Sequence, residues 1–304
     1  MIRPEAARPG KRGIRVVQGR VTHGWILRHL DGAIARLRGE IARLRIAWRW
    51  QRLRREPRRH GLPGRLIVSL TSHEARFATL HLSLKCLLDQ TVRPDAVILW
   101  LSEMAMARLP RNVVALRDAG LIIAAKPDIG SYGKIMPLLE SEPAAFIVTA
   151  DDDAYYHRGW LAELVDAVRP GEREVVCHRA HRIELGSDGL PLPYDRWDVN
   201  LRKPEASRLV FPTGVGGVLF PPGIFHPDML NSDLYGSLCP TGDDLWLYWM
   251  ALRQGANFRK IGRRRPVPLW PRSQRISLHQ INVLNGGNDR QIAKLIGRFG
   301  FPIP

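Results

Sequence analysis

Three consecutive carboxylates, Asp151, Asp152 and Asp153, follow an apolar run over residues 144–148. This run carries no polar side chain, which predicts a strand buried on both faces of a sheet. Adjacent carboxylates repel one another and raise each other's pKa unless a positive charge lies between them. Mg²⁺ or Mn²⁺ relieves such repulsion, and these ions bind through one or two carboxylates plus substrate phosphates. The triplet therefore predicts a metal-bridged phosphate site, with a plain polar loop as the alternative.

A second acidic pair, Asp243 and Asp244, opens a segment that we expect to be a helix ending before Gly255. Thr241 or Asp243 is expected to cap this helix. Capping explains one acid in the first turn more readily than two, so the other acid is a candidate for chemistry. A glycine-rich run over residues 214–222 precedes the pair and would let a ligand approach the backbone closely, although a β-bulge is an equal alternative.

The elements that must position these acids begin at Arg65, where apolar runs alternate with segments of helical period. The expected strands are residues 66–70, 96–101, 121–125 and 144–148, and residues 175–177 and 182–185 are further candidates. The spacing of the first four is that of βα units, which predicts an α/β domain with a mostly parallel sheet and helices on both faces. Three polar clusters (71–73, 126–128 and 151–153) fall at strand carboxyl ends, where such sheets bind ligands. Neither GxGxxG nor GxxxxGK[ST] occurs, so dinucleotide and P-loop classes lack their signature.

The net charge of +17 is concentrated at one end of the 304-residue chain. Residues 1–64 contain 17 basic and 4 acidic side chains, whereas residues 65–304 contain 29 and 25. Nucleic-acid binding by the domain is therefore disfavoured. Three separated cysteines without a CxxC pair argue against a disulfide framework or zinc site and suit a reducing compartment. Because no run approaches about 18 apolar residues and no signal-peptide core is visible, we expect a cytoplasmic protein.

The basic N-terminal segment divides into three parts. Residues 1–22 lack periodicity and are expected to be disordered, residues 23–56 to form a basic amphipathic helix, and residues 57–64 to form a linker. The helix has a heptad seam made of Leu27, Leu30, Ile34, Leu37, Ile41, Leu44 and Trp48, with arginines on its flanks. Such a seam is typical of a coiled-coil homodimer or of a helix lying on an anionic membrane. Packing against the chain's own domain is a further alternative.

Six motifs occur in an order and spacing that resemble family-2-like glycosyltransferases of the GT-A fold along about residues 65–260. They are residues 67–73 followed by Arg76, residues 90–95, residues 130–134, residues 149–153, residues 214–222, and Asp243-Asp244. The resemblance implies that residues 65–304 form a GT-A-like domain with a nucleotide-binding half and an acceptor half. The acidic pair is written differently from the usual Glu-Asp form of the family.

The resemblance also implies roles for individual residues. The nucleotide-sugar donor would be bound by Thr71, His73, Arg76 and Lys134, and Asp152 would also contact it. The DxD metal site for Mn²⁺ or Mg²⁺ would be formed by Asp151 and Asp153, with His279 as a further metal ligand or donor contact. The general base would be Asp244 or Asp243. Asp244 is the first choice, because the second acid is usually the base in relatives.

These roles imply an inverting, metal-dependent glycosyltransferase, of the hexosyltransferase type, that moves a sugar from a nucleotide-diphosphate donor to a hydroxyl of a polysaccharide or glycolipid. The expected place is the cytoplasm, peripheral on the inner face of the membrane. Two alternatives remain open. A nucleotidyltransferase should carry a glycine-rich, Arg- or Lys-containing loop after the first strand, which residues 71–76 do not provide. A basic coiled-coil adaptor with an inactive domain would not need the acids at all.

Overall fold

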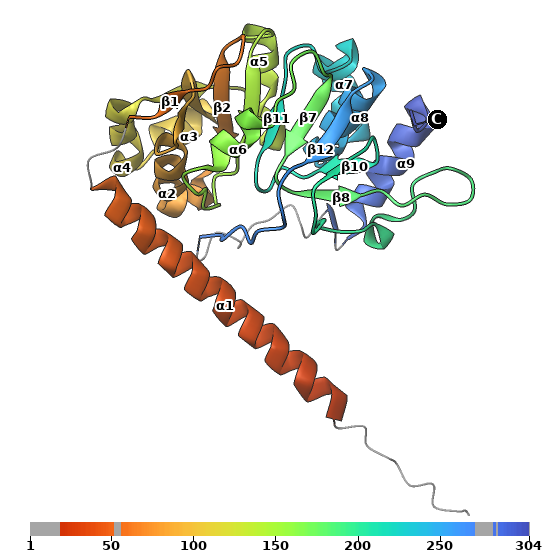
Figure 1. Cartoon of the computed structure of the whole chain (residues 1–304), viewed down its shortest axis with the longest axis horizontal. Coiled ribbons are helices and arrows are strands. Elements are labelled where there is room, and N and C mark those ends of the chain that lie inside the picture. Colours follow the sequence, from red (N-terminus) through yellow and green to blue (C-terminus); the bar gives the residue numbers. More distant parts are fainter. Residues whose placement is uncertain (1–18, 52–55, 271–281, 284, 304) are drawn as a thin grey trace, which may run out of the picture.

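The computed structural model describes residues 19–51, 56–270, 282–283 and 285–303, with side chains of the first helix described for residues 33–34 and from residue 36 onward. An eight-stranded sheet forms the centre, in the order β5-β4-β2-β6-β11-β7-β12-β9 (Figure 1). Neighbouring strands from β5 to β6 are parallel, and β7 is parallel to β12. Strand β11 runs antiparallel between β6 and β7.

The strands are short and mostly apolar. The central sheet contains β2 (Leu66–Thr71), β4 (Ala96–Leu101), β5 (Leu121–Ala125), β6 (Phe146–Thr149), β7 (Glu174–Cys177), β9 (Glu205–Ala206), β11 (Val218–Phe220) and β12 (Asn257–Lys260). Two small sheets pair β1 (Arg58–Arg59) with β3 (Val92–Arg93) and β8 (Ala180–Arg182) with β10 (Val210–Pro212).

Helices cover both faces of the central sheet (Figure 1). They are α1 (Gly19–Trp50), α2 (Phe77–Leu88), α3 (Glu103–Ala107), α4 (Arg111–Val114), α5 (Met136–Ser141), α6 (Trp160–Asp166), α7 (Ser232–Leu238), α8 (Asp243–Arg253) and α9 (Gly287–Phe299). Short 3-10 turns are η1 (Glu74–Arg76), η2 (Ala115–Ala119), η3 (Gly130–Lys134), η4 (Tyr194–Arg196) and η5 (Pro227–Leu230).

Two separate cores form because successive side chains of a strand point to opposite faces of the sheet. In β6, Phe146 and Val148 join a core with α2 and α6, whereas Ile147 joins a core with α5, α8 and α9. The buried strands therefore need apolar side chains on both faces, which is the pattern that the sequence carries. The expected α/β architecture, a mostly parallel sheet flanked by helices, is confirmed.

The strands expected over 66–70 and 175–177 differ from β2 and β7 by one residue, and two other expected strands differ by more. The fourth begins at Phe146 rather than at residue 144, because the chain turns at Pro143 and the Ala145 amide donates to the Glu142 carbonyl (2.9 Å). The strand expected over 182–185 is wrong: β8 ends at Arg182, and only an isolated bridge forms at Leu185.

The cap expected for α8 is also wrong. Gly242 occupies the N-cap position, and no side chain there accepts a hydrogen bond from the first amides of α8. Instead, the Gln291 side chain, from α9, accepts hydrogen bonds from the amides of Thr241 (3.2 Å) and Gly242 (2.9 Å). These two amides precede the helix, so Gln291 holds the segment that enters α8 rather than capping its first turn, and neither Asp243 nor Asp244 serves as the cap.

Helix α1 extends away from the rest of the domain (Figure 1). Near its C-terminal end, the small and apolar side chains of Ala42 and Ile46 are buried in the core beside α2. Arg49 forms an ion pair with the buried Asp89 (2.5 Å). The described part of the heptad seam lies on another face and is exposed: Ile34 (45%), Leu37 (61%), Ile41 (39%), Leu44 (64%) and Trp48 (56%).

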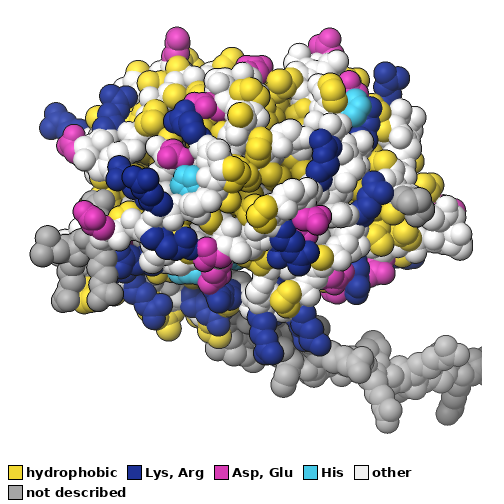
Figure 2. Space-filling view, turned by 45° about the horizontal axis from the view of Figure 1, so that its top comes forward, with side chains coloured by type: hydrophobic (Ala, Val, Ile, Leu, Met, Phe, Trp, Pro, Cys, Tyr) yellow, Lys and Arg dark blue, Asp and Glu magenta, His cyan; other side chains and the backbone are white. Residues whose placement is uncertain are grey.

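Charge on the domain surface is mixed. On the face drawn in Figure 2, Lys and Arg side chains are interspersed with Asp, Glu and apolar side chains. None of the helices within the described residues is both long enough and apolar enough to cross a bilayer.

Candidate active site

A cavity of 800 Å³ opens at the carboxyl ends of the central strands. Regions far apart in the sequence line it, among them the end of β6, the turn η3, the loop before β11, the start of α8, and Asn282, Val283 and Asn288. The cavity brings together the predicted residues Arg76, Lys134, Asp151, Asp152, Asp153, Asp243 and Asp244. Thr71 and His73 lie at the end of β2 but do not line it, and the Thr71 hydroxyl donates to the Trp100 carbonyl (3.0 Å).

The first two acids of the triplet have different surroundings. Asp151 is half-buried, and its Oδ2 atom has no hydrogen-bond partner in the described part of the chain. Burial and repulsion from Asp152 and Asp153 raise its pKa to about 6, against the attraction of Lys134. Asp152 accepts a hydrogen bond from the Ser72 hydroxyl (2.5 Å), and burial raises its pKa to about 6 as well.

Asp153 is buried and paired with a cation. The Arg76 guanidinium, which is also buried, lies 2.8 Å from Asp153 Oδ2 and 3.9 Å from Asp152 Oδ1. Arg76 therefore offsets part of the negative charge of the triplet, as the repulsion between three adjacent acids requires. Arg76 lies in the turn η1, which comes shortly after β2, and this turn places the Arg76 side chain beside the end of β6.

The acids of α8 lie against Lys134. Lys134 is buried, and its Nζ atom forms an ion pair with Asp243 Oδ2 (2.7 Å). Burial lowers the pKa of Lys134, but the attraction of Asp243, Asp244 and Asp151 exceeds this effect and raises it. Lys134 therefore stays protonated and neutralises Asp243.

Among the described residues, no cation forms an ion pair with Asp244. Its Oδ2 accepts a hydrogen bond from the Gly214 amide (2.9 Å), at the start of the glycine-rich run. Burial and repulsion from Asp243 raise the pKa of Asp244 to about 7. A carboxylate with a pKa near neutrality that faces a cleft is suited to accept a proton.

The donor set at the end of β6 partly fits a divalent cation. Asp151 offers a buried carboxylate oxygen without a partner, which is what a hard cation needs. However, the described residues contain no group of three or more His, Cys, Asp or Glu side chains arranged around a common point. An ion here would therefore rely on Asp151, Asp153 and substrate phosphate oxygens. His279 lies outside the described residues.

Several cleft residues were missed by sequence reasoning, above all Arg179, Tyr194, Asn200 and Asn288. Arg179 is half-buried, and its guanidinium donates to the Thr213 hydroxyl (2.8 Å). A signal for it existed, since residues 178–179 are polar and directly follow an apolar strand, as the other site clusters do. The others carry no comparable signal: Tyr194 begins the turn η4, Asn200 lies in a loop, and Asn288 lies in the first turn of α9.

The fold and the cleft together define an α/β protein with an acidic and basic site at the carboxyl ends of its strands. No protein-family profile matches the chain, and no curated protein matches it. Among solved structures, it is similar to nucleotide-sugar glycosyltransferases and nucleotidyltransferases.

Three of these structures illustrate the similarity. Glucosyl-3-phosphoglycerate synthase from Mycobacterium tuberculosis, solved with Mn²⁺, UDP and glucosyl-3-phosphoglycerate, is 14% identical over 79% of this chain and 82% of that one, with a TM-score of 0.39. A mannosyltransferase from Pyrobaculum calidifontis, solved with GDP-mannose and Mn²⁺, is 16% identical over 48% and 45%, with a TM-score of 0.31. 4-Diphosphocytidyl-2C-methyl-D-erythritol synthase from Anaerococcus prevotii is 10% identical over 74% and 96%, with a TM-score of 0.43. At these values the similarity assigns no reaction to the chain and no role to a residue.

Proposed function

We propose that the chain is a glycosyltransferase that moves a sugar from a nucleotide-diphosphate donor to an acceptor hydroxyl, with a divalent cation and with inversion. The observation that carries this proposal is the meeting of three groups in one cleft. These are Asp151 with its unpartnered carboxylate oxygen, the buried cation Lys134, and Asp244 with a pKa of about 7. Asp151 and Lys134 would bind a diphosphate with its metal ion, and Asp244 would accept a proton.

On the donor side, Asp151 and Asp153 would hold Mn²⁺ or Mg²⁺ together with the donor's phosphate oxygens. When bound, the ion supplies positive charge that stabilises the leaving nucleoside diphosphate. Arg76 and Lys134 add two cations that line the same cleft. Arg76 forms an ion pair with Asp153 (2.8 Å). If Asp153 bound a metal ion instead, the Arg76 guanidinium would be able to bind a phosphate oxygen of the donor.

On the acceptor side, the contacts favour Asp244 over Asp243 as the general base. Asp243 is neutralised by Lys134 (2.7 Å), whereas Asp244 accepts the Gly214 amide, forms no ion pair with a described residue, and has a raised pKa. Asp244 would accept the proton of the acceptor hydroxyl while the hydroxyl oxygen attacks the anomeric carbon of the donor sugar. The bond between the anomeric carbon and the donor's phosphate oxygen breaks in the same step, and the nucleoside diphosphate leaves. Attack from the face opposite the leaving group inverts the anomeric centre.

The first experiment is the thermal stability of the full chain with a panel of nucleoside diphosphates, with and without Mn²⁺. Ligand binding to the native state raises the melting temperature by mass action. We expect one nucleotide to raise it only with Mn²⁺, and we expect Asp151→Asn to remove this increase. Asp166→Asn, an exposed change on α6 outside the cleft, is the matched control. No increase with any nucleotide would refute a donor site here and would favour the adaptor alternative.

A nucleotidyltransferase would bind nucleotides in the same cleft but give a different product. It would consume a nucleoside triphosphate and release pyrophosphate, whereas a glycosyltransferase releases a nucleoside diphosphate from a nucleotide sugar. Product analysis by ion-exchange chromatography separates these two reactions. Pyrophosphate as the product would refute glycosyl transfer.

We further propose that α1 lies on an anionic membrane surface at the cytoplasmic face, with the exposed seam (Ile34, Leu37, Ile41, Leu44 and Trp48) toward the lipid. Exposed arginines at positions 36, 38 and 45 flank this seam. The charge complements anionic headgroups, which attract basic amphipathic helices by roughly 1 kcal/mol per Lys or Arg.

Vesicle flotation with the full chain tests the membrane proposal. We expect binding to vesicles that contain phosphatidylserine, weaker binding to neutral vesicles, and loss of binding in Leu37→Glu/Leu44→Glu. Both residues are exposed, so these changes leave the domain folded. Binding that the double variant retains would refute the proposal. A dimer in light scattering that the double variant abolishes would assign the seam to a second copy instead.

A further inference from the structure

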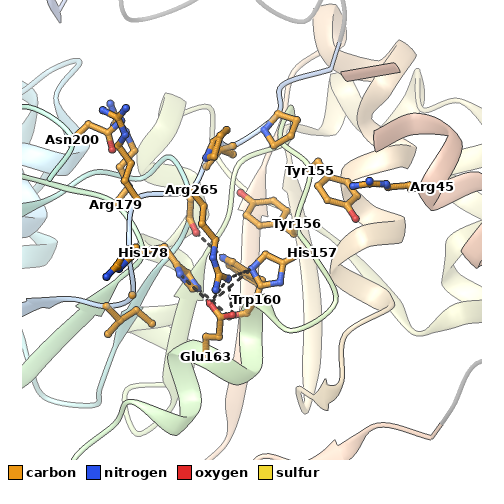
Figure 3. A pocket seen from close by; sticks show the side chains of 18 residues that line it. Arg45, Tyr155, Tyr156, His157, Trp160, Glu163, His178, Arg179, Asn200 and Arg265 are labelled. Atoms are coloured by element: carbon orange, nitrogen blue, oxygen red, sulfur yellow. Dashed lines mark hydrogen bonds and ion pairs between the residues drawn. The ribbon is translucent and has the colours of Figure 1, made fainter. Parts of the chain in front are cut away.

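A second cavity of 320 Å³ lies beside the cleft (Figure 3). It is lined by the loop between β6 and α6, the residues after β7, the stretch 261–268 after β12, and Arg45 of α1. Arg179, Asn200 and Arg264 line both this cavity and the cleft, so the two spaces adjoin at these residues. We call it the side pocket.

One wall of the side pocket is aromatic and apolar. Tyr155, Tyr156 and Trp160 contribute rings from the segment that directly follows the acidic triplet. Val267 and its neighbouring prolines lie on the stretch after β12. Trp160 is fixed because its indole N–H donates to the Gly216 carbonyl (2.6 Å). Such a wall is suited to the apolar part of a ligand rather than to an ion alone.

The acid of the side pocket is already neutralised. Among the lining residues, Glu163 is the one carboxylate, and Arg265 donates to both of its oxygens (2.7 and 3.0 Å). His178 and His157 lie 3.7 and 3.8 Å from the same carboxylate. Figure 3 shows these four side chains turned toward one another on one side of the pocket.

The remaining arginines are not neutralised by the described part of the chain. Arg45, Arg263 and Arg264 are exposed, and no described carboxylate forms an ion pair with them or with Arg179. Arg179 is half-buried and donates to the neutral Thr213 hydroxyl (2.8 Å). Burial lowers the pKa of its guanidinium, while the attraction of Tyr194, Asp244 and Asp151 acts in the opposite direction. Four positive charges therefore surround an apolar pocket that opens toward the proposed general base.

Resting on the glycosyl transfer proposed above, we propose that the side pocket binds the acceptor, and that the acceptor is an amphiphile with a phosphate-type anion. The anion would lie between Arg179 and Arg264, where the pocket meets the cleft. Guanidinium groups bind phosphate oxygens in a bidentate manner, which fixes orientation as well as affinity. The apolar part would lie along Tyr155, Trp160 and Val267. Arg45 belongs to α1, so the proposed membrane-facing helix borders the same pocket.

Isothermal titration calorimetry of the full chain with hexyl phosphate tests this inference, with inorganic phosphate and hexanol as probes of each half alone. We expect hexyl phosphate to bind at least about tenfold more tightly than inorganic phosphate and than hexanol. Arg264→Gln should weaken hexyl phosphate about tenfold, as expected for loss of a charge-assisted contact. Arg264 is exposed, so its loss leaves the fold intact; Arg179→Gln tests the buried partner. Arg117→Gln, an exposed change on η2, should have no effect.

The same titration is repeated with saturating nucleoside diphosphate and Mn²⁺. Binding of hexyl phosphate that persists supports an acceptor pocket. Displacement by the nucleotide would overturn the inference, because the arginines would then serve the donor phosphates. The inference would also be overturned if hexyl phosphate did not bind at all. It would be overturned as well if Arg264→Gln and Arg179→Gln bound hexyl phosphate as tightly as the unmodified chain. The donor site is tested separately. If that proposal fails, the melting temperature will not rise with nucleotide and Mn²⁺, and this result does not depend on whether hexyl phosphate binds.

Discussion

Replacing Asp244 by Asn should stabilise the protein while it abolishes transfer. Burial and the neighbouring Asp243 raise the pKa of Asp244 from 3.8 to about 7. Because the folded pKa lies above the unfolded one, the protonated carboxyl stabilises the fold. This contribution is fully present below about pH 4 and is lost as the pH rises to about 7. Asn resembles the protonated form, and its side-chain oxygen can still accept the Gly214 amide.

The magnitude follows from the shift. About three pH units at 1.36 kcal/mol each give at most about 4 kcal/mol. Asp244 lines an open cleft where water screens its charge, so we expect Asp244→Asn to gain about 1 to 2 kcal/mol at pH 8. The advantage over the unmodified chain should grow from about pH 4 to pH 7 and stay constant above. Loss of a general base should lower kcat by about 10²- to 10⁴-fold.

Urea denaturation followed by circular dichroism, at several values between pH 5 and pH 8, measures the stability; release of nucleoside diphosphate measures transfer. Asp243→Asn is the matched control. It removes the carboxylate 2.7 Å from the buried Lys134, so it should destabilise the protein over this whole range. An Asp244→Asn variant that is less stable at pH 8, or whose gain is the same at every pH, would refute the reasoning about its charge.

Three further predictions follow from the site. The kcat/KM of the unmodified chain should rise with pH to a plateau above about 7, because Asp244 must be ionised, and a flat profile would contradict this role. Gly214→Ala should lower kcat with little change in melting temperature, because its Cβ would lie 3.0 Å from Asp244 Oδ1 and 3.1 Å from Lys134 Nζ; Gly236→Ala, with open space around it, should be silent in the same assay. Gly217→Ala should destabilise the protein by about 2 kcal/mol or more in urea denaturation, since φ is +96° and its Cβ would meet a tryptophan ring at 2.4 Å, and an unchanged midpoint would count against the described loop.

The sequence by itself determined the layers of the fold and the edge at which the site lies. Strands β4 (Ala96–Leu101) and β5 (Leu121–Ala125) have the bounds expected from their apolar runs. A strand buried on both faces is mostly apolar, so the first charged residues after it mark its carboxyl end. This local rule placed the triplet that begins at Asp151 beside the other strand ends, and the fold of the parallel strands brings them to one edge.

The tertiary structure decided which charges meet and which faces are covered. Lys134 and Asp243 are more than a hundred residues apart, and only the path of the chain brings them to 2.7 Å. In α1, the regular seam gave the stronger sequence signal, yet the domain packs against Ala42 and Ile46. Periodicity reports that a helix has an apolar face, but close packing against the surface of the domain decides which face is buried. Tertiary contacts also separate Asp243 from Asp244: adjacent acids are alike in sequence, but Asp243 forms an ion pair with Lys134, whereas Asp244 accepts the Gly214 amide and has a raised pKa.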